Sequence, residues 1–179
     1  NSPGNDMRFS DEKIEAARNF ANKLWNASRF VLMNLKESDE ELLIKPDDRD
    51  LAIEDKWLLD KFNKLTKVVT DNMNNFEVGI ALSEIYSFTW DTFCDWYIEM
   101  VKSRIFEEGT ISSLTAKRVL VQTLTGILKL LHPYMPFITE EIYQALPHTT
   151  ESIMISSYPT FDEGMSYEAE AQDVERIIG

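Results

Sequence analysis

Long segments with a helical spacing of apolar residues, separated by short breaks, limit the fold of this chain more than any other feature. The first segment begins near Ser10, which two acidic residues follow, as is favourable at the start of a helix. From there to about residue 36, apolar residues recur at intervals of three and four: Ile14, Ala17, Ala21, Leu24, Ala27, Val31 and Leu35. Such spacing is typical of an amphipathic helix. Similar spacing predicts further helices over 51–73, 77–106, 112–131 and 138–146, with a last one starting within 165–177.

The breaks between these segments contain residues that interrupt helices. Clustered acids and Pro46 predict a solvated loop over 37–50, and Asn74 with Asn75 predicts a turn. Pro133 cannot extend the helix before it. The one segment with an extended pattern is 152–158. Four long helices and a short fifth, joined by short connections, therefore predict an all-α antiparallel helix bundle.

The bundle is expected to occupy residues 1–147, and residues 148–179 are expected to form a C-terminal extension. Bulky apolar residues within 77–106 form a continuous stripe, which predicts helix–helix packing. We expect the core and the helix contacts to include Trp57, Trp90, Trp96 and Tyr97. The single cysteine, Cys94, lies in the same stripe and is expected to be a small core residue rather than a nucleophile.

The charge of the chain is strongly acidic but unevenly distributed. The 179 residues contain 18 Lys and Arg against 31 Asp and Glu, a net charge of −13. This charge disfavours non-specific nucleic-acid binding, because phosphates are repelled. Residues 8–36 are the exception, with six basic against three acidic residues. The first helix is therefore the part of the chain that attracts an anion.

Known catalytic and metal-binding patterns are missing from the sequence. The chain has no glycine-rich phosphate loop, no nucleophile elbow and no zinc-ligand spacing for its two histidines and one cysteine. Glu140 and Glu141 are adjacent, so their side chains diverge on a helix. His132 is interpreted as a helix-end residue. We therefore expect no catalytic residue, no metal site and no membrane span, and the lone cysteine is compatible with a cytoplasmic protein.

The first helix has a polar face with an unusual composition. With 100° per residue, this face is opposite the apolar arc. Phe30 falls among polar and basic residues there, which favours base stacking, while Asn can read base edges and Arg or Lys can bind phosphate. The candidate RNA-binding residues are Arg18, Asn22, Lys23, Asn26, Arg29 and Phe30. The alternative from the residues alone is a solvated face with Phe30 packed under a neighbouring loop.

Four stretches resemble the anticodon-binding domain of valyl-tRNA synthetases. Residues 18–34 read Arg-Asn-Phe-Ala-Asn-Lys-Leu-Trp-Asn-Ala-Ser-Arg-Phe-Val-Leu-Met-Asn, like the first bundle helix of that family. The stretches Gly-Asn-Asp-Met-Arg-Phe over 4–9, Phe-Cys-Asp-Trp-Tyr-Ile-Glu over 93–99 and Leu-His-Pro-Tyr-Met-Pro-Phe-Ile-Thr-Glu-Glu-Ile over 131–142 are also similar. The resemblance covers about residues 4–160.

The resemblance implies a helical domain that binds the anticodon stem-loop of valine tRNA, with Phe30 stacking on an anticodon base beside Arg29 and Asn26. Glu12 departs from the family, since some members have a basic residue there. The catalytic domain of the same parent chain, which uses ATP, would be a partner, and this fragment itself would need no cofactor. The catalytic signatures of the family are absent here, so we expect a piece of a longer protein, with a coiled-coil arm following it.

Two alternatives to this function stay open. One is the equivalent domain of an isoleucyl-type synthetase, since the isoleucyl and leucyl enzymes share looser versions of the same stretches. The other is a helical protein-interaction module, for which an acidic bundle needs no RNA at all.

Overall fold

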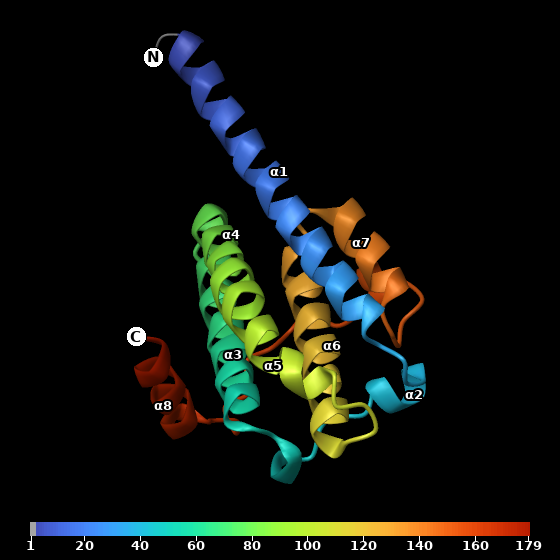
Figure 1. Cartoon of the computed structure of the whole chain (residues 1–179). Helices are drawn as coiled ribbons and strands as arrows, with labels where there is room; N and C mark the ends of the chain where they lie inside the picture. The colour runs from blue at the N-terminus through green and yellow to red at the C-terminus, as the bar shows by residue number, and fades with distance from the viewer. Residues whose placement is uncertain (1–2) are drawn as a thin grey trace.

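A computed structural model describes residues 3–179, with side chains from residue 11 onward, and confirms the all-α fold. Within these residues every regular element is helical. The elements in chain order are α1 (Pro3–Met33), α2 (Asp39–Leu42), η1 (Asp48–Asp50), α3 (Ile53–Asn74), α4 (Val78–Ser87), η2 (Phe88–Tyr97), α5 (Ile98–Ile105), α6 (Ile111–Leu131), α7 (Pro136–Ala145), η3 (Ile153–Ile155) and α8 (Glu168–Ile178). Figure 1 shows α3 and α4 side by side, and α1 in front of α6.

Helix α1 begins earlier than its sequence predicts. It starts at Pro3 rather than at Ser10, so Ser10 is an interior residue and not the cap. Proline suits the first turn of a helix, because its missing N–H has no partner there in any case. The side chains of the motif over 4–9 and of Ser10 lie outside the described ones. The first half of α1 projects beyond the other helices, and its second half packs on the bundle (Figure 1).

The helix predicted over 77–106 is continuous but changes geometry in its middle. Between α4 and α5, the segment η2 is a π-helix, and at its end the Ile98 N–H donates to the carbonyl oxygen of Phe93, five residues earlier. A π-helix has more residues per turn, so side chains within it leave the α-helical spacing. Trp90 and Trp96 are consequently 36% and 43% exposed, and their expected core packing was wrong.

The remaining core predictions for this region are confirmed. Trp57 and Tyr97 are fully buried, and Cys94 is 8% exposed. Helix α6 runs through the middle of the core and buries residues on most of its circumference: Val119, Leu120, Leu124, Ile127, Leu128 and Leu131. The bundle is thus organised around α6, with α1, α3, α5 and α7 in contact with it.

A buried polar network joins α3 to the continuous helix. Arg104 donates from Nη1 and Nη2 to the two carboxylate oxygens of Asp55, at 2.8 and 2.9 Å, and the Tyr97 hydroxyl donates to Asp55 at 2.6 Å. Asp55 has no exposed surface, and its second oxygen also accepts from the Ala52 N–H. Every partner is satisfied, which a charged group inside a core requires.

The acidic segment 37–50 is more ordered than a solvated loop. It contains α2, which Ser38 and Glu41 begin with a capping box, and η1, which Asp47 caps. Local capping by short polar side chains explains this order, since such residues stabilise brief helical turns. Glu37 also accepts a hydrogen bond from Lys117, a side chain buried in α6, at 2.7 Å.

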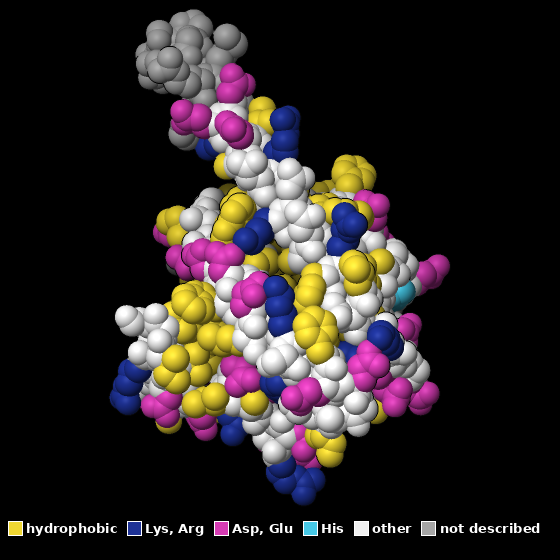
Figure 2. Space-filling model, in the orientation of Figure 1, with side chains coloured by type: hydrophobic (Ala, Val, Ile, Leu, Met, Phe, Trp, Pro, Cys, Tyr) yellow, Lys and Arg dark blue, Asp and Glu magenta, His cyan; other side chains and the backbone are white. Residues whose placement is uncertain are grey.

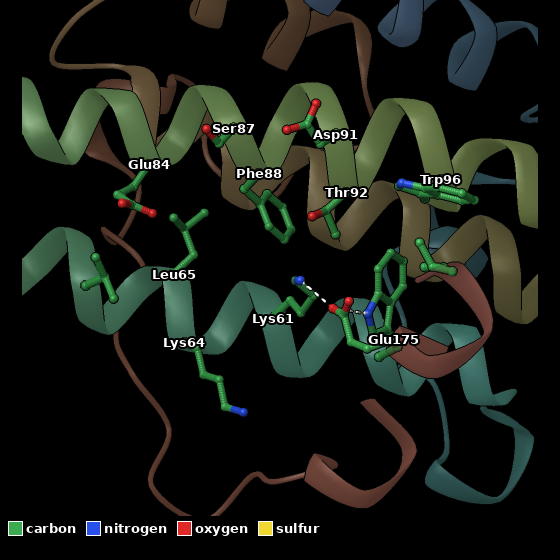
Figure 3. Close-up of a pocket in the computed structure, with 13 residues that line it drawn as sticks. Lys61, Lys64, Leu65, Glu84, Ser87, Phe88, Asp91, Thr92, Trp96 and Glu175 are labelled. Carbon is green, nitrogen blue, oxygen red and sulfur yellow. Dashed lines mark hydrogen bonds and ion pairs between the residues drawn. The ribbon is translucent and has the colours of Figure 1, made fainter. Parts of the chain in front are cut away.

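The residues after 147 pack on the bundle. The segment 152–158 is not a strand, because Ser152 caps the short helix η3 through the Met154 N–H. Helix α8 lies along α3, where Glu175 accepts hydrogen bonds from Lys61 at 2.6 Å and from Trp57 Nε1 at 3.1 Å (Figure 3). Buried side chains of this part, which are Ile153, Ala171 and Val174, belong to the main core. The expected boundary at residue 147 stays a prediction.

Candidate nucleic-acid interface

The six residues predicted on α1 divide into two groups. Arg18, Asn22 and Arg29 are exposed along the outward line of the helix. The other three line a groove of about 400 Å³ between α1, η2 and α5, and they are Lys23, Asn26 and Phe30. The opposite wall and the floor come from Ala27, Cys94, Asp95, Ile98, Glu99 and Lys102. Lys and Arg side chains flank α1 on this side of the molecule (Figure 2).

Phe30 is half-buried rather than freely exposed. Its ring packs against the hydrophobic core while it borders the groove. The ammonium group of Lys102 lies 5.5 Å from the centroid of the ring, which is within cation–π distance. This combination holds the ring in place at the groove edge. The groove edge therefore presents an aromatic group whose position is already restricted.

Lys23 is engaged with the opposite wall of the groove. Its ammonium group forms an ion pair with Asp95 at 2.7 Å and lies 4.8 Å from the ring centroid of Trp90. Both charged side chains are partly exposed, and exposed ion pairs are weak, about 0–1 kcal/mol. Lys23 can therefore exchange Asp95 for a phosphate at little cost.

The wall formed by η2 and α5 was missed by the sequence reasoning. It adds Trp90, Asp95, Glu99 and Lys102 to the site, and Lys102 pairs with Glu99 at 2.6 Å. The periodicity of one helix indicates its polar face but not which helix stands across from it. The aromatic residues within 77–106 could have indicated this wall of the groove, but an α-helical period places Trp90 in the core.

The electrostatics of the site leave the outward cations available. Among the described residues, neither Arg18 nor Arg29 has an ion-pair partner, in contrast to Lys23 and Lys102. Asp95 and Glu99 place two carboxylates on the opposite wall. The charge pattern therefore offers phosphate binding on the outer line of α1 and hydrogen-bond acceptors inside the groove.

The residues that could have suggested catalysis have structural roles. Burial raises the pKa of Cys94 to about 12, so its thiol stays protonated near neutral pH. His132 follows the end of α6 and contacts Thr139 Oγ1 through Nδ1 at 3.0 Å, as expected of a helix-end residue. In the described part of the chain, no group of three His, Cys, Asp or Glu side chains is arranged to hold a metal ion. No helix in that part is long and apolar enough to cross a membrane.

A second hollow, of about 440 Å³, lies between α3, η2 and α8 (Figure 3). It is lined by Lys61, Glu175 and Trp96, among others, and none of the six residues predicted for RNA contributes to it. Glu175 is already paired with Lys61, and this ion pair holds the pKa of the carboxyl below its usual value. This hollow lies where α8 packs along α3, and it shares no lining residue with the α1 groove.

Comparison with known proteins agrees with the RNA-binding interpretation. The family of anticodon-binding domains of tRNA ligases matches residues 55–179, which is more than half of the chain. The chain therefore belongs to this family of anticodon-binding domains. The matched range includes η2 and α5, the wall of the groove opposite α1.

Three similar relatives are all valine–tRNA ligases. The chain is 49% identical to the valine–tRNA ligases of Clostridium acetobutylicum and Clostridium perfringens, over 179 residues and 99% of its length. It is 45% identical to the valine–tRNA ligase of a Bacillus cereus strain over 177 residues. These matches include α1. The chain spans 20% of the length of each of these relatives.

Proposed function

We propose that this chain is the anticodon-binding part of a cytoplasmic valine–tRNA ligase and that it binds the anticodon stem-loop of valine tRNA. The observation that carries the proposal is the position of Phe30. The ring borders a groove of about 400 Å³, and the same helix carries Arg18 and Arg29, which have no ion-pair partner among the described residues. The high identity to valine–tRNA ligases supports the choice of valine over isoleucine.

Each of the six residues has a role that its chemistry supports. Phe30 stacks on a base that enters the groove, and Asn22 and Asn26 form hydrogen bonds with base edges. Arg18 and Arg29 bind phosphates on the outer line of α1, and Lys23 joins them when it leaves Asp95. The acidic remainder of the domain repels RNA that does not fit this surface.

The chemical step belongs to another part of the proposed parent protein. No catalytic residue is assigned to this chain, and the ATP-dependent attachment of valine to tRNA is proposed to occur in the catalytic domain of the same parent. The domain described here would need no cofactor of its own. Its contribution is the selection of the tRNA.

The test is a titration of this domain with fluorescent anticodon stem-loops of valine and isoleucine tRNAs at low salt. Phe30→Leu keeps an apolar side chain in the half-buried position but removes the stacking surface. We expect this change to weaken the valine complex about 5- to 150-fold, the equivalent of about 1–3 kcal/mol per stacked base. Phe161→Leu, a partly exposed aromatic residue outside the groove, is the matched control.

The arginines are tested by the salt dependence of the same titration. For single-stranded RNA, log affinity falls against log salt with a slope of roughly −0.7 per phosphate contact, so each lost contact makes the slope less steep by roughly 0.7. Arg18→Gln and Arg29→Gln should show this loss, whereas Arg49→Gln on η1 should not. A preference for the isoleucine loop would indicate an isoleucyl-type synthetase. Unchanged RNA affinity in Phe30→Leu, with loss of a protein contact, would indicate an interaction module.

A further inference from the structure

A pocket of about 390 Å³ lies between α2, α6 and the segment that follows α7. Helices α2 and α7 both contact α6, and they lie on the same side of it in Figure 1. The volume is within the range of pockets that hold small molecules. The pocket shares no lining residue with the α1 groove or with the hollow beside α8, so it is a separate site.

Part of the lining is aromatic and held in place by packing. The ring of Phe62, from α3, lies so close to Gly126 of α6 that a Cβ atom there would overlap it. The buried ring of Tyr143 packs against the ring of His148, with centroids 4.9 Å apart. These contacts are made without a ligand. The pocket is therefore preformed, as pockets for small molecules usually are.

Two apolar side chains at the edge of the pocket are left in contact with water. Leu43 and Ile44, directly after α2, line the pocket and are 38% and 52% exposed. Leu42, the residue before them, is buried. A ligand with an apolar body would remove this surface from water, which is favourable. The lining therefore suits a molecule that is at least partly apolar.

The charged residues of the pocket are all basic. Lys45, Arg118 and Lys129 line it, and its lining contains no Asp or Glu. The chain as a whole has a net charge of −13, and both the hollow beside α8 and the α1 groove have carboxylates in their linings. This pocket therefore attracts an anion, although the chain as a whole repels one.

The donor groups of these basic residues are available to a ligand. Among the described residues, Lys45, Arg118 and Lys129 form no ion pair. Arg118 donates from Nε to the carbonyl oxygen of Glu41 at 2.8 Å, which orients the guanidinium and leaves both Nη groups without a described partner. His148 donates from Nδ1 to a backbone carbonyl oxygen at 2.8 Å, so its Nε2 is available as well. An oriented guanidinium matches the geometry of phosphate oxygens.

We propose that this pocket binds a small organic phosphate, in which a phosphate monoester is attached to a flat apolar body. The body covers Leu43 and Ile44, and the phosphate accepts hydrogen bonds from Arg118 and from the two lysines. A phosphate monoester has about −1.5 to −2 charges at pH 7 and three acceptor oxygens, so it suits a pocket with several cations better than a carboxylate does. The site is independent of the RNA interface proposed on α1.

The test is a calorimetric titration of this chain with naphthyl phosphate, naphthol and inorganic phosphate at one ionic strength. The three probes supply the phosphate on an aromatic body, the body alone and the phosphate alone. We expect naphthyl phosphate to bind at least about ten-fold more tightly than either of the others, because it alone uses both parts of the pocket. Absent binding of naphthyl phosphate, or equal binding of naphthol, would overturn the proposal.

Two matched arginine variants locate the site. Arg118→Gln should weaken the binding of naphthyl phosphate about ten-fold or more, since hydrogen bonds to a charged group are lost, and should leave RNA affinity unchanged. Arg29→Gln removes another arginine without an ion-pair partner and should have the opposite pattern. Each proposal can therefore fail while the other holds.

A third variant avoids any effect on the fold, because Arg118 also contacts the backbone after α2. Lys129→Gln removes a cation that has no described hydrogen bond, and it should weaken the binding of naphthyl phosphate as well. Unchanged binding in both Arg118→Gln and Lys129→Gln would contradict the proposal. Displacement of bound naphthyl phosphate by the anticodon stem-loop would make the pocket part of the RNA surface and would also contradict it.

Discussion

Lys23 on α1 and Asp95 on η2 form an ion pair across the groove, with 2.7 Å between Nζ and Oδ1. The pair connects α1, which the sequence predicts to bind RNA, with the η2 wall, which the sequence did not predict to be part of the site. In the free domain, Asp95 compensates a charge that the proposed function assigns to phosphate binding. Under the proposed function, a carboxylate and a phosphate compete for Lys23, and the affinity for RNA depends on this competition.

Asp95→Asn should strengthen RNA binding. The change removes the competing carboxylate and one negative charge from the groove, and we expect affinity to rise about 1.4- to five-fold at low salt, the equivalent of about 0.2–1 kcal/mol for an exposed pair. Fluorescence anisotropy with the valine anticodon stem-loop measures this change. Asp173→Asn, an exposed carboxylate on α8, is the control. A weaker complex in Asp95→Asn would instead mean that Asp95 itself accepts a hydrogen bond from the RNA.

Asp55→Ala should destabilise the fold strongly. The substitution removes the two hydrogen bonds that the Arg104 guanidinium donates to Asp55 and leaves Glu54, at 3.0 Å, as the remaining carboxylate partner of this 12% exposed side chain. Removal of one partner from a buried ion pair costs about 3–5 kcal/mol, which urea unfolding can measure. Asp47→Ala breaks an exposed pair with Arg49 and should leave the free energy of unfolding almost unchanged, because solvent screens this pair. Equal effects of the two substitutions would contradict the buried network.

Glycine substitutions in two helices should have opposite effects. A Cβ atom at Gly126 would lie 2.4 Å from Cζ of Phe62, so Gly126→Ala forces α6 and α3 apart and should cost about 1–3 kcal/mol. Phe62→Leu in the same chain should recover part of this loss. Gly79 in α4 has no atom within 4 Å of a built Cβ, and Gly79→Ala should stabilise by about 0.5–1 kcal/mol. Urea unfolding of the three variants checks both signs.

The Cys94 thiol should be unreactive in the folded domain. With a pKa of about 12 instead of 9.0, the fraction of Cys94 present as thiolate at pH 8 is about a thousandfold smaller. Because the thiolate is the reactive form, alkylation should be slower by the same factor. Iodoacetamide labelling followed by mass spectrometry should detect the single cysteine only after unfolding in urea. Since the folded pKa is raised, the unfolded chain loses this proton first, and stability should fall as pH rises above about 9. Rapid labelling of the native domain would contradict the burial of Cys94.

Much of the fold could be predicted from local patterns. The helices over 51–73 and 112–131 match α3 and α6 closely, because their apolar residues keep one helical period from end to end. Helix breaks at Asn75 and Pro133 were also located correctly. The order within 37–50 and the cap at Ser152 depend on single side-chain hydrogen bonds, and composition does not reveal these.

The sequence by itself determined an all-helical domain and one polar face of α1 with Phe30 in it, because a helical period is a local property that neighbouring residues encode. Only the tertiary structure decided what lies across from that face. Asp95, Glu99 and Lys102 reach the groove because η2 is a π-helix and because α5 packs beside α1. The contact between α1 and η2 joins residues about 70 positions apart in the chain, such as Lys23 and Asp95, and the spacing within a single helix contains no information about such contacts.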